Sequence, residues 1–185
     1  MSLHTPSELI QNRIIQSVQN DKKELLKYLI FNYTPDDKSE LLIKTKLLSL
    51  ITNTPECFKI PLITGSVWLT DKENRHLLIT QTDNLWNIPT RISNSDADLE
   101  AVILDYLKQQ FNISATSEGI FDLDYREAEK TFDICFLMKC DIPKENTFKN
   151  YRFVMEDALD HTLFNRKEVL IRRLKKWNAV QKERK

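Results

Sequence analysis

The chain has 185 residues, of which 41% are hydrophobic, and it carries 27 basic and 27 acidic side chains. This size supports one well-buried core and excludes two full-sized domains, so we expect a single domain with an extension. Zero net charge gives no electrostatic footprint for a membrane surface and argues against nucleic acid as a partner. The chain has only two glycines, Gly65 and Gly119, which excludes glycine-rich phosphate loops and dinucleotide-binding fingerprints.

The three cysteines, Cys57, Cys135 and Cys140, are odd in number and form no C-x-x-C pair. Neither a disulfide framework nor a zinc site is therefore expected, and a reducing, cytoplasmic setting fits best. Polar and charged residues interrupt residues 1–19, so we expect no secretory signal and no transmembrane span there. Export by a machinery that reads other signals stays open.

Residues 1–53 are predicted to form a helical N-terminal extension. Thr5-Pro6-Ser7-Glu8 and Thr34-Pro35-Asp36-Asp37 each combine a threonine N-cap, a proline at the first helical position and an acid at the third. Apolar residues predict a first helix with a break near Asn20-Asp21, and a last helix ending near Ile51. We expect this extension to pack on residues 54–185 rather than to serve as a partner surface.

Strands are predicted in the second part of the chain. Residues 63–70 and 75–82 flank the turn-like Asp71-Lys72-Glu73-Asn74, which is typical of a hairpin. In residues 132–140 every second side chain is apolar, so Cys135 and Cys140 are expected on opposite faces. Residues 121–125 and 151–155 are shorter candidates.

Two helices are predicted among and after these strands. Residues 99–113, LEAVILDYLKQQFNI, have apolar residues at helical spacing, an N-cap signal in Ser93-Asn94-Ser95-Asp96, and Asn112 suited to a left-handed C-cap. Residues 167–180 form a closing helix. Residues 166–185 include nine basic and two acidic residues, which gives a local charge of +7 and leaves −7 for the rest of the chain. We expect these basic residues to form a solvated face rather than a partner site.

Trp86-Asn87-Ile88-Pro89-Thr90-Arg91, followed by the helix at 99–113, resembles the box of Nudix hydrolases, G-x5-E-x7-R-E-U-x-E-E-x-G-U with U apolar. Three further segments resemble a bacterial Nudix subgroup that has a helical N-terminal extension: 54–58 with 64–68, 77–80, and the closing-helix segment 172–177. The resemblance implies an α/β fold: a Nudix-like α/β/α sandwich with a mixed sheet, preceded by the α-helical extension.

The catalytic positions of the box are changed throughout. When the last apolar position is set on Ile113, only it and Leu107 match the family pattern. Glutamine amides replace the glutamate pair. The residues at the changed positions are Arg91, Ala97, Asp105, Tyr106, Gln109, Gln110 and Asn112.

These glutamates matter because Mg²⁺ takes oxygen ligands in near-octahedral geometry and generates the attacking hydroxide. Neutral amides are poor substitutes. The resemblance therefore implies a pseudoenzyme with no catalytic residues and no cofactor, acting as a ligand-binding or protein-interaction module. Its ligand would be nucleotide-like and would lie between the box helix and the sheet, on Arg91, Tyr106, Gln109, Gln110 and Trp86.

Two alternatives stay open. A rewired pyrophosphohydrolase acting on nucleoside-diphosphate-linked substrates could use Asp96, Glu100 or Asp105 for Mg²⁺, although acids in a first helical turn more commonly cap the helix. Alternatively, the helical N-terminus and the basic closing helix bind another macromolecule.

Overall fold

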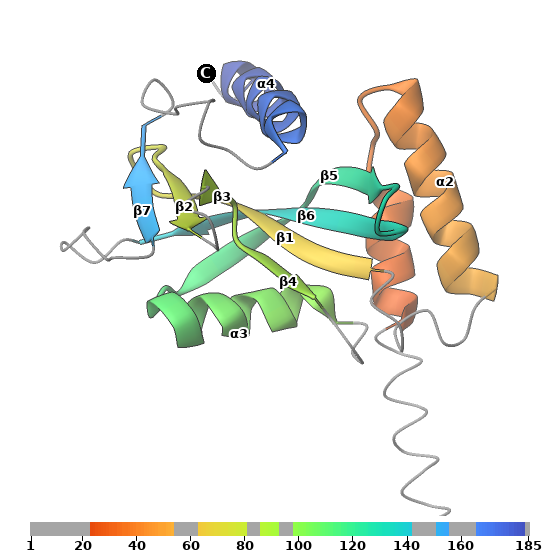
Figure 1. Ribbon diagram of the computed structural model, residues 1–185, viewed down its shortest axis with the longest axis horizontal. Coiled ribbons are helices and arrows are strands. Elements are labelled where there is room, and N and C mark those ends of the chain that lie inside the picture. The colour runs from red at the N-terminus through yellow and green to blue at the C-terminus, as the bar shows by residue number, and fades with distance from the viewer. Residues whose placement is uncertain are drawn as a thin grey trace, which may run out of the picture.

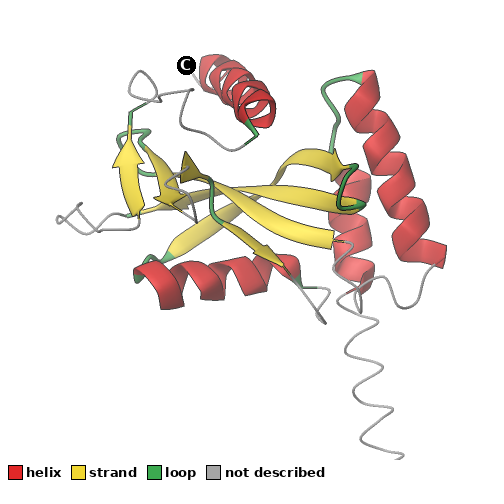
Figure 2. Ribbon diagram, viewed as in Figure 1, coloured by secondary structure: helices red, strands yellow, loops and turns green. Residues whose placement is uncertain are grey.

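The structure, a computed structural model, has a seven-stranded sheet with α3 on one face and α4 on the other (Figure 1). Two helical segments, residues 23–32 and α2, stand at one end of the sheet (Figure 2). The described residues are 23–53, 63–80, 86–92, 98–141, 151–155 and 166–183. The labelled elements are α2 (Lys38–Asn53), β1 (Ile63–Thr70), β2 (His76–Thr80), β3 (Trp86–Asn87), β4 (Thr90–Ile92), α3 (Leu99–Phe111), β5 (Ala115–Arg126), β6 (Thr131–Cys140), β7 (Tyr151–Val154) and α4 (Lys167–Glu183).

The sheet is mixed, as expected. Its main path runs β3-β2-β1-β6-β5, with β4 paired to β1 and β7 paired to β2. β1 and β6 run parallel, with Thr70 opposite Lys139, and the other recorded pairs are antiparallel. The carboxyl ends of β1 and β6 therefore lie at the same edge of the sheet.

Alternation along the strands builds a separate core on each face. On β6, Ile134, Phe136 and Met138 belong to the α3-side core, whereas Cys135 and Leu137 belong to the α4-side core. The two free cysteines of the described residues, Cys135 and Cys140, thus lie on opposite faces, which confirms the prediction from their odd spacing. No helix in the described part of the chain is both long and apolar enough to cross a membrane.

Helix α3 packs closely on β1 because Gly65 has no side chain. A Cβ at Gly65 would lie 2.6 Å from Cδ1 of Ile103, well inside van der Waals contact. The helix ends as predicted, with Asn112 left-handed at φ 54° and its backbone N–H bonded to Leu107 and Lys108 carbonyls. It begins at Leu99, where the Asp98 carboxylate accepts a hydrogen bond from the Ala101 N–H (3.1 Å). The expected cap at residues 93–96 lies outside the described residues.

The described N-terminal helices pack on the sheet, as predicted. Leu26, Ile30, Leu47 and Ile51 are buried in the α3-side core together with sheet residues. The first part of the extension, residues 1–22, lies outside the described residues, as does Cys57.

Two elements begin three or more residues away from their predicted starts, and α4 ends at Glu183 rather than at residue 180. Helix α2 begins at Lys38 rather than next to Pro35, because the Asp37 carboxylate, and not Thr34, accepts the Glu40 backbone N–H (2.8 Å). Strand β5 begins at Ala115 rather than near residue 121. Its register on β6 shifts twice, between Ser117 and Gly119 and between Ile120 and Asp122, and these irregularities hide the simple alternation that identifies a strand in sequence.

Candidate functional site

Helix α3 carries three of the residues at the Nudix glutamate positions, namely Tyr106, Gln109 and Gln110. Gln109 and Gln110 are exposed, as is Asp105. Tyr106 is half-buried, and its ring meets the Phe111 ring edge-on at 5.4 Å between centroids. The sheet-facing side of α3 is apolar, with three buried residues: Leu99, Ile103 and Leu107.

The structure separates the predicted ligand residues. Trp86 on β3 packs against the α4-side core, whereas Tyr106 belongs to α3, which covers the other face. Arg91 on β4 pairs through its backbone with Gly65, and its side chain lies outside the described part. Binding of a ligand by these residues together stays a prediction.

The described donors in this region form no group that could hold a magnesium ion. Asp96 and Ala97 are outside the described residues. Glu100 is half-buried beside Leu29 of the N-terminal helix, while Asp105 is five residues further along α3 and exposed. Such a spacing places two side chains on different faces of a helix. Within the described ranges, no three His, Cys, Asp or Glu side chains are grouped so that they could hold a metal ion.

A cluster of charged side chains is buried between the sheet and α4. Arg173 donates from Nε to Asp122 on β5 (2.6 Å) and from Nη2 to Asp133 on β6 (2.8 Å). These three side chains are at most 3% exposed. Arg172 donates to Asp122 (2.7 Å) and, at longer range, to Asp124 (3.4 Å). We call these five residues the charge cluster; four of the side chains are buried and that of Arg172 is 40% exposed.

Local backbone geometry and hydroxyl groups complete this cluster. The register shift between Ile120 and Asp122 lets Phe121 pack in the α4-side core while the next residue, Asp122, also reaches α4. The hydroxyls of Thr64 and Ser66 on β1 donate to the two oxygens of Asp133 at 2.8 and 2.9 Å. The buried carboxylates therefore have the donors that an ionised group needs in the interior.

These contacts shift the pKa values of the cluster. Burial alone would raise the pKa of Asp122 and Asp133, but the charge and hydrogen bonds of Arg173, joined at Asp122 by Arg172, hold both pKa values below the ordinary 3.8. Burial raises the pKa of the neighbouring Cys135 to about 12, so its thiol stays protonated and unreactive near neutral pH.

A second polar contact connects the N-terminal extension to the domain. The Glu40 carboxylate accepts hydrogen bonds from the Tyr33 hydroxyl and the Leu123 N–H on β5 (3.0 Å). Lys176 on α4 donates to the same carboxylate at 3.2 Å from each oxygen, and to the Tyr33 hydroxyl. Burial and the Glu40 carboxylate raise the Tyr33 pKa far above its usual range.

The expected solvated basic face of the closing helix is thus only partly correct. Arg166, Arg172, Arg173 and Lys176 pair with Asp or Glu side chains of this same chain. The sequence analysis missed these pairs because the acidic partners lie 40 or more residues away in the chain. The acidic residues could have been noticed, since Asp122 and Asp124 alternate within one predicted strand and Asp133 lies within another, where charged residues are unexpected.

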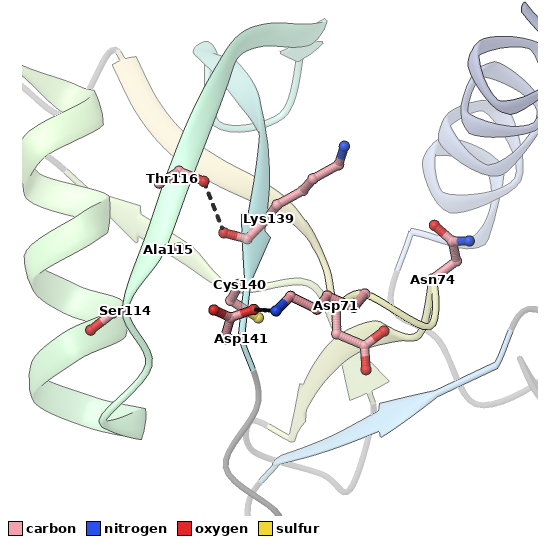
Figure 3. Close-up of a pocket in the computed structure, with 9 residues that line it drawn as sticks. Asp71, Asn74, Ser114, Ala115, Thr116, Lys139, Cys140 and Asp141 are labelled. Atoms are coloured by element: carbon pink, nitrogen blue, oxygen red, sulfur yellow. Dashed lines mark hydrogen bonds and ion pairs between the residues drawn. The ribbon is translucent and has the colours of Figure 1, made fainter. Parts of the chain in front are cut away.

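Two open pockets border these elements. One, of about 420 Å³, lies between the start of α2 and α4, and its lining includes Asp36, Glu40, Arg172 and Lys176. The other, of about 550 Å³, lies at the ends of β1 and β6 beside the start of β5 (Figure 3), and we call it the strand-end pocket. It is lined by Asp71, Lys72, Asn74, Ser114, Ala115, Thr116, Lys139, Cys140 and Asp141.

The fold is similar to those of solved Nudix hydrolase structures. Ap4A hydrolase of C. elegans matches with a TM-score of 0.53 and 18% identity, over 66% of this chain and 99% of that one. A Sinorhizobium meliloti protein described as an oxidoreductase also matches, with a TM-score of 0.51 and 13% identity over 63% of this chain. This chain spans only 39% of that protein. A binary complex of the C. elegans Ap4A hydrolase matches with a TM-score of 0.52 and 17% identity, over 65% of this chain and 98% of that one.

Sequence comparison adds no relative. No protein-family profile matches the chain, and no curated protein matches it. These structural matches are below 25% identity, so they define the fold alone. The chain has a Nudix-type α/β fold, as the resemblance in its sequence implied.

Proposed function

We propose that this protein has kept the Nudix fold without the Nudix reaction and acts as a ligand-binding or protein-interaction module. The observation that carries the proposal is the contrast within α3. Its buried residues and its left-handed Asn112 cap keep the geometry of a box helix, while exposed Gln109 and Gln110 stand where the reaction needs carboxylates.

The same contrast weighs against a rewired pyrophosphohydrolase. That activity needs several carboxylates around one magnesium ion, because the ion must polarise a phosphoryl oxygen and generate hydroxide. Glu100 and Asp105 lie on different faces of α3, so these two acids do not meet around one ion.

The ion pairs of α4 disfavour a basic helix that docks on a macromolecule. Arg172, Arg173 and Lys176 already neutralise carboxylates of this chain, and an outside partner would have to compete with them. An interaction surface is better supported on the N-terminal helices. Five of the six large, exposed hydrophobic residues in the described part lie there: Leu25, Tyr28, Phe31, Leu41 and Leu42.

The proposal is tested by incubating the full chain with nucleoside diphosphate derivatives and Mg²⁺ or Mn²⁺, followed by mass spectrometry of the products. We expect no metal-dependent product. If product does form, the triple variant Asp96→Asn, Glu100→Gln, Asp105→Asn tests whether those acids bind the metal. Replacing the exposed Tyr28 and Phe31 with serine tests the interaction surface, because a partner of that surface should then be lost while the buried face of the helix is kept.

A further inference from the structure

The strand-end pocket lies where two parallel neighbours end. β1 runs into Asp71 and β6 runs into Asp141, and the pocket is bounded on its third side by Ser114, Ala115 and Thr116 at the start of β5 (Figure 3). In open α/β sheets, ligands commonly bind outside the carboxyl ends of the strands. The volume, about 550 Å³, falls within the range of roughly 300–1,000 Å³ that small-molecule sites occupy.

The lining of this pocket has two acidic residues, Asp71 and Asp141, and two basic residues, Lys72 and Lys139. Asp71 is already fixed, because its carboxylate accepts the backbone N–H groups of Glu73 (2.9 Å) and Arg75 (2.8 Å) and pairs with the Arg75 side chain. Lys139 pairs with Glu118 at 2.7 Å. The remaining two charged residues, Lys72 and Asp141, pair with each other and are both exposed.

Lys72 and Asp141 connect the β1–β2 turn to the end of β6 across the pocket. Their charged atoms are 2.9 Å apart, and the two side chains are 82% and 78% exposed. Ion pairs with such exposure contribute little to stability, because water screens them and two mobile side chains must be held. A ligand that brings one positive and one negative group can therefore replace this pair at little cost.

The rest of the lining supplies neutral polar and apolar contacts. Asn74 holds a left-handed backbone (φ 59°) and presents an exposed amide. Ala115 and the buried Cys140 belong to the edge of the α3-side core. Burial raises the pKa of Cys140 to about 12, so its thiol is neutral and adds no charge to the pocket.

We propose that the strand-end pocket binds a small zwitterion of the amino-acid type, with its ammonium group on Asp141 and its carboxylate on Lys72. A nucleoside diphosphate, whose charged groups are all negative, is a poorer match, because the lining has two carboxylates as well as two lysines. This inference rests on the proposed function, because it names the class of ligand that the proposed binding module would take.

The test is a nuclear magnetic resonance titration of the ¹⁵N-labelled full chain with the standard amino acids. The backbone amide signals of Asn74, Ala115 and Cys140 are the readout. We expect at least one amino acid to shift these signals in a saturable way. Its N-acetyl and carboxamide derivatives, which each lack one charge, should bind about tenfold more weakly or worse, because each loses a charge-assisted contact.

Variants locate the site. Lys72→Met and Asp141→Asn should each weaken binding by a similar factor, whereas Lys46→Met, an exposed lysine on α2, should leave it unchanged. Three results would overturn the inference: no amino acid shifts the pocket signals, the singly charged derivatives bind equally well, or a nucleoside diphosphate binds the pocket more tightly. Failure of the proposed function gives a separate signal, namely metal-dependent product in the mass-spectrometric assay.

Discussion

Arg173 on α4 donates to Asp133 on β6 at 2.8 Å, and neither side chain is more than 3% exposed. Asp122, which also accepts from Arg173, is equally buried. This contact joins the closing helix to the centre of the sheet. Buried ion pairs of this kind are sensitive to loss of one partner, because the other charge is then left in a low-dielectric interior.

Replacing Arg173 with methionine should lower the free energy of unfolding by about 3–5 kcal/mol, since Asp122 and Asp133 would lose their shared cation. Urea denaturation followed by circular dichroism measures the change. Lys175→Met, at an exposed position two residues further along, should change it by no more than about 0.5 kcal/mol. Equal effects of the two variants would contradict a structural role for Arg173.

The cluster also predicts how stability depends on pH. The folded-state pKa values of Asp122 and Asp133 lie below 3.8, so the unfolded chain takes up their protons first as the pH falls. Their contribution is complete above the ordinary pKa and is lost as the pH drops below about 4 towards the folded-state values.

Urea titrations at a series of pH values check this, with Asp133→Asn compared with the original chain. The variant should be less stable at neutral pH and should lose less stability on acidification. Asp105→Asn, at an exposed site on α3, should retain the acid dependence of the original chain. An unchanged acid profile in Asp133→Asn would refute the assignment.

Gly65→Ala should destabilise the fold by about 1–3 kcal/mol, because the new Cβ would meet Cδ1 of Ile103 at 2.6 Å. Ile103→Val removes that methyl group, so the alanine should cost less in the valine background. A double-mutant cycle by urea denaturation measures this coupling. Gly119→Ala is the control: its φ of 105° strains any L residue, and valine at position 103 should bring no relief.

Glu40→Ala should loosen the N-terminal helices. The Leu123 N–H would lose the Glu40 carboxylate as its acceptor, and an unsatisfied buried donor costs about 1–3 kcal/mol. Amide hydrogen exchange of residues 24–32 should become faster relative to that of β6. Glu24→Ala removes only an exposed contact with Lys27 and should leave exchange on β6 and α2 unaltered. Unchanged exchange in Glu40→Ala would argue against the contact.

Much of the fold could be predicted from local patterns in the sequence. The β1–β2 hairpin, the alternation on β6 and the left-handed cap at Asn112 each depend on residues close together in the chain, and each was predicted. The charge cluster was missed because Arg173 and Asp133 are 40 residues apart and no local pattern pairs them. The strand-end pocket was missed for the same reason, since Lys72 meets Asp141 only after β1 and β6 lie side by side.

Helix α3 is folded like a box helix, and we propose that the protein lacks the Nudix reaction. The most direct measurement is product formation by the full chain, at high concentration, from a mixed panel of nucleoside diphosphate derivatives with Mg²⁺ or Mn²⁺, followed by mass spectrometry. No product above the protein-free control, with or without chelator, is the predicted result. Turnover that increases with protein concentration and stops when a chelator is added would contradict the account.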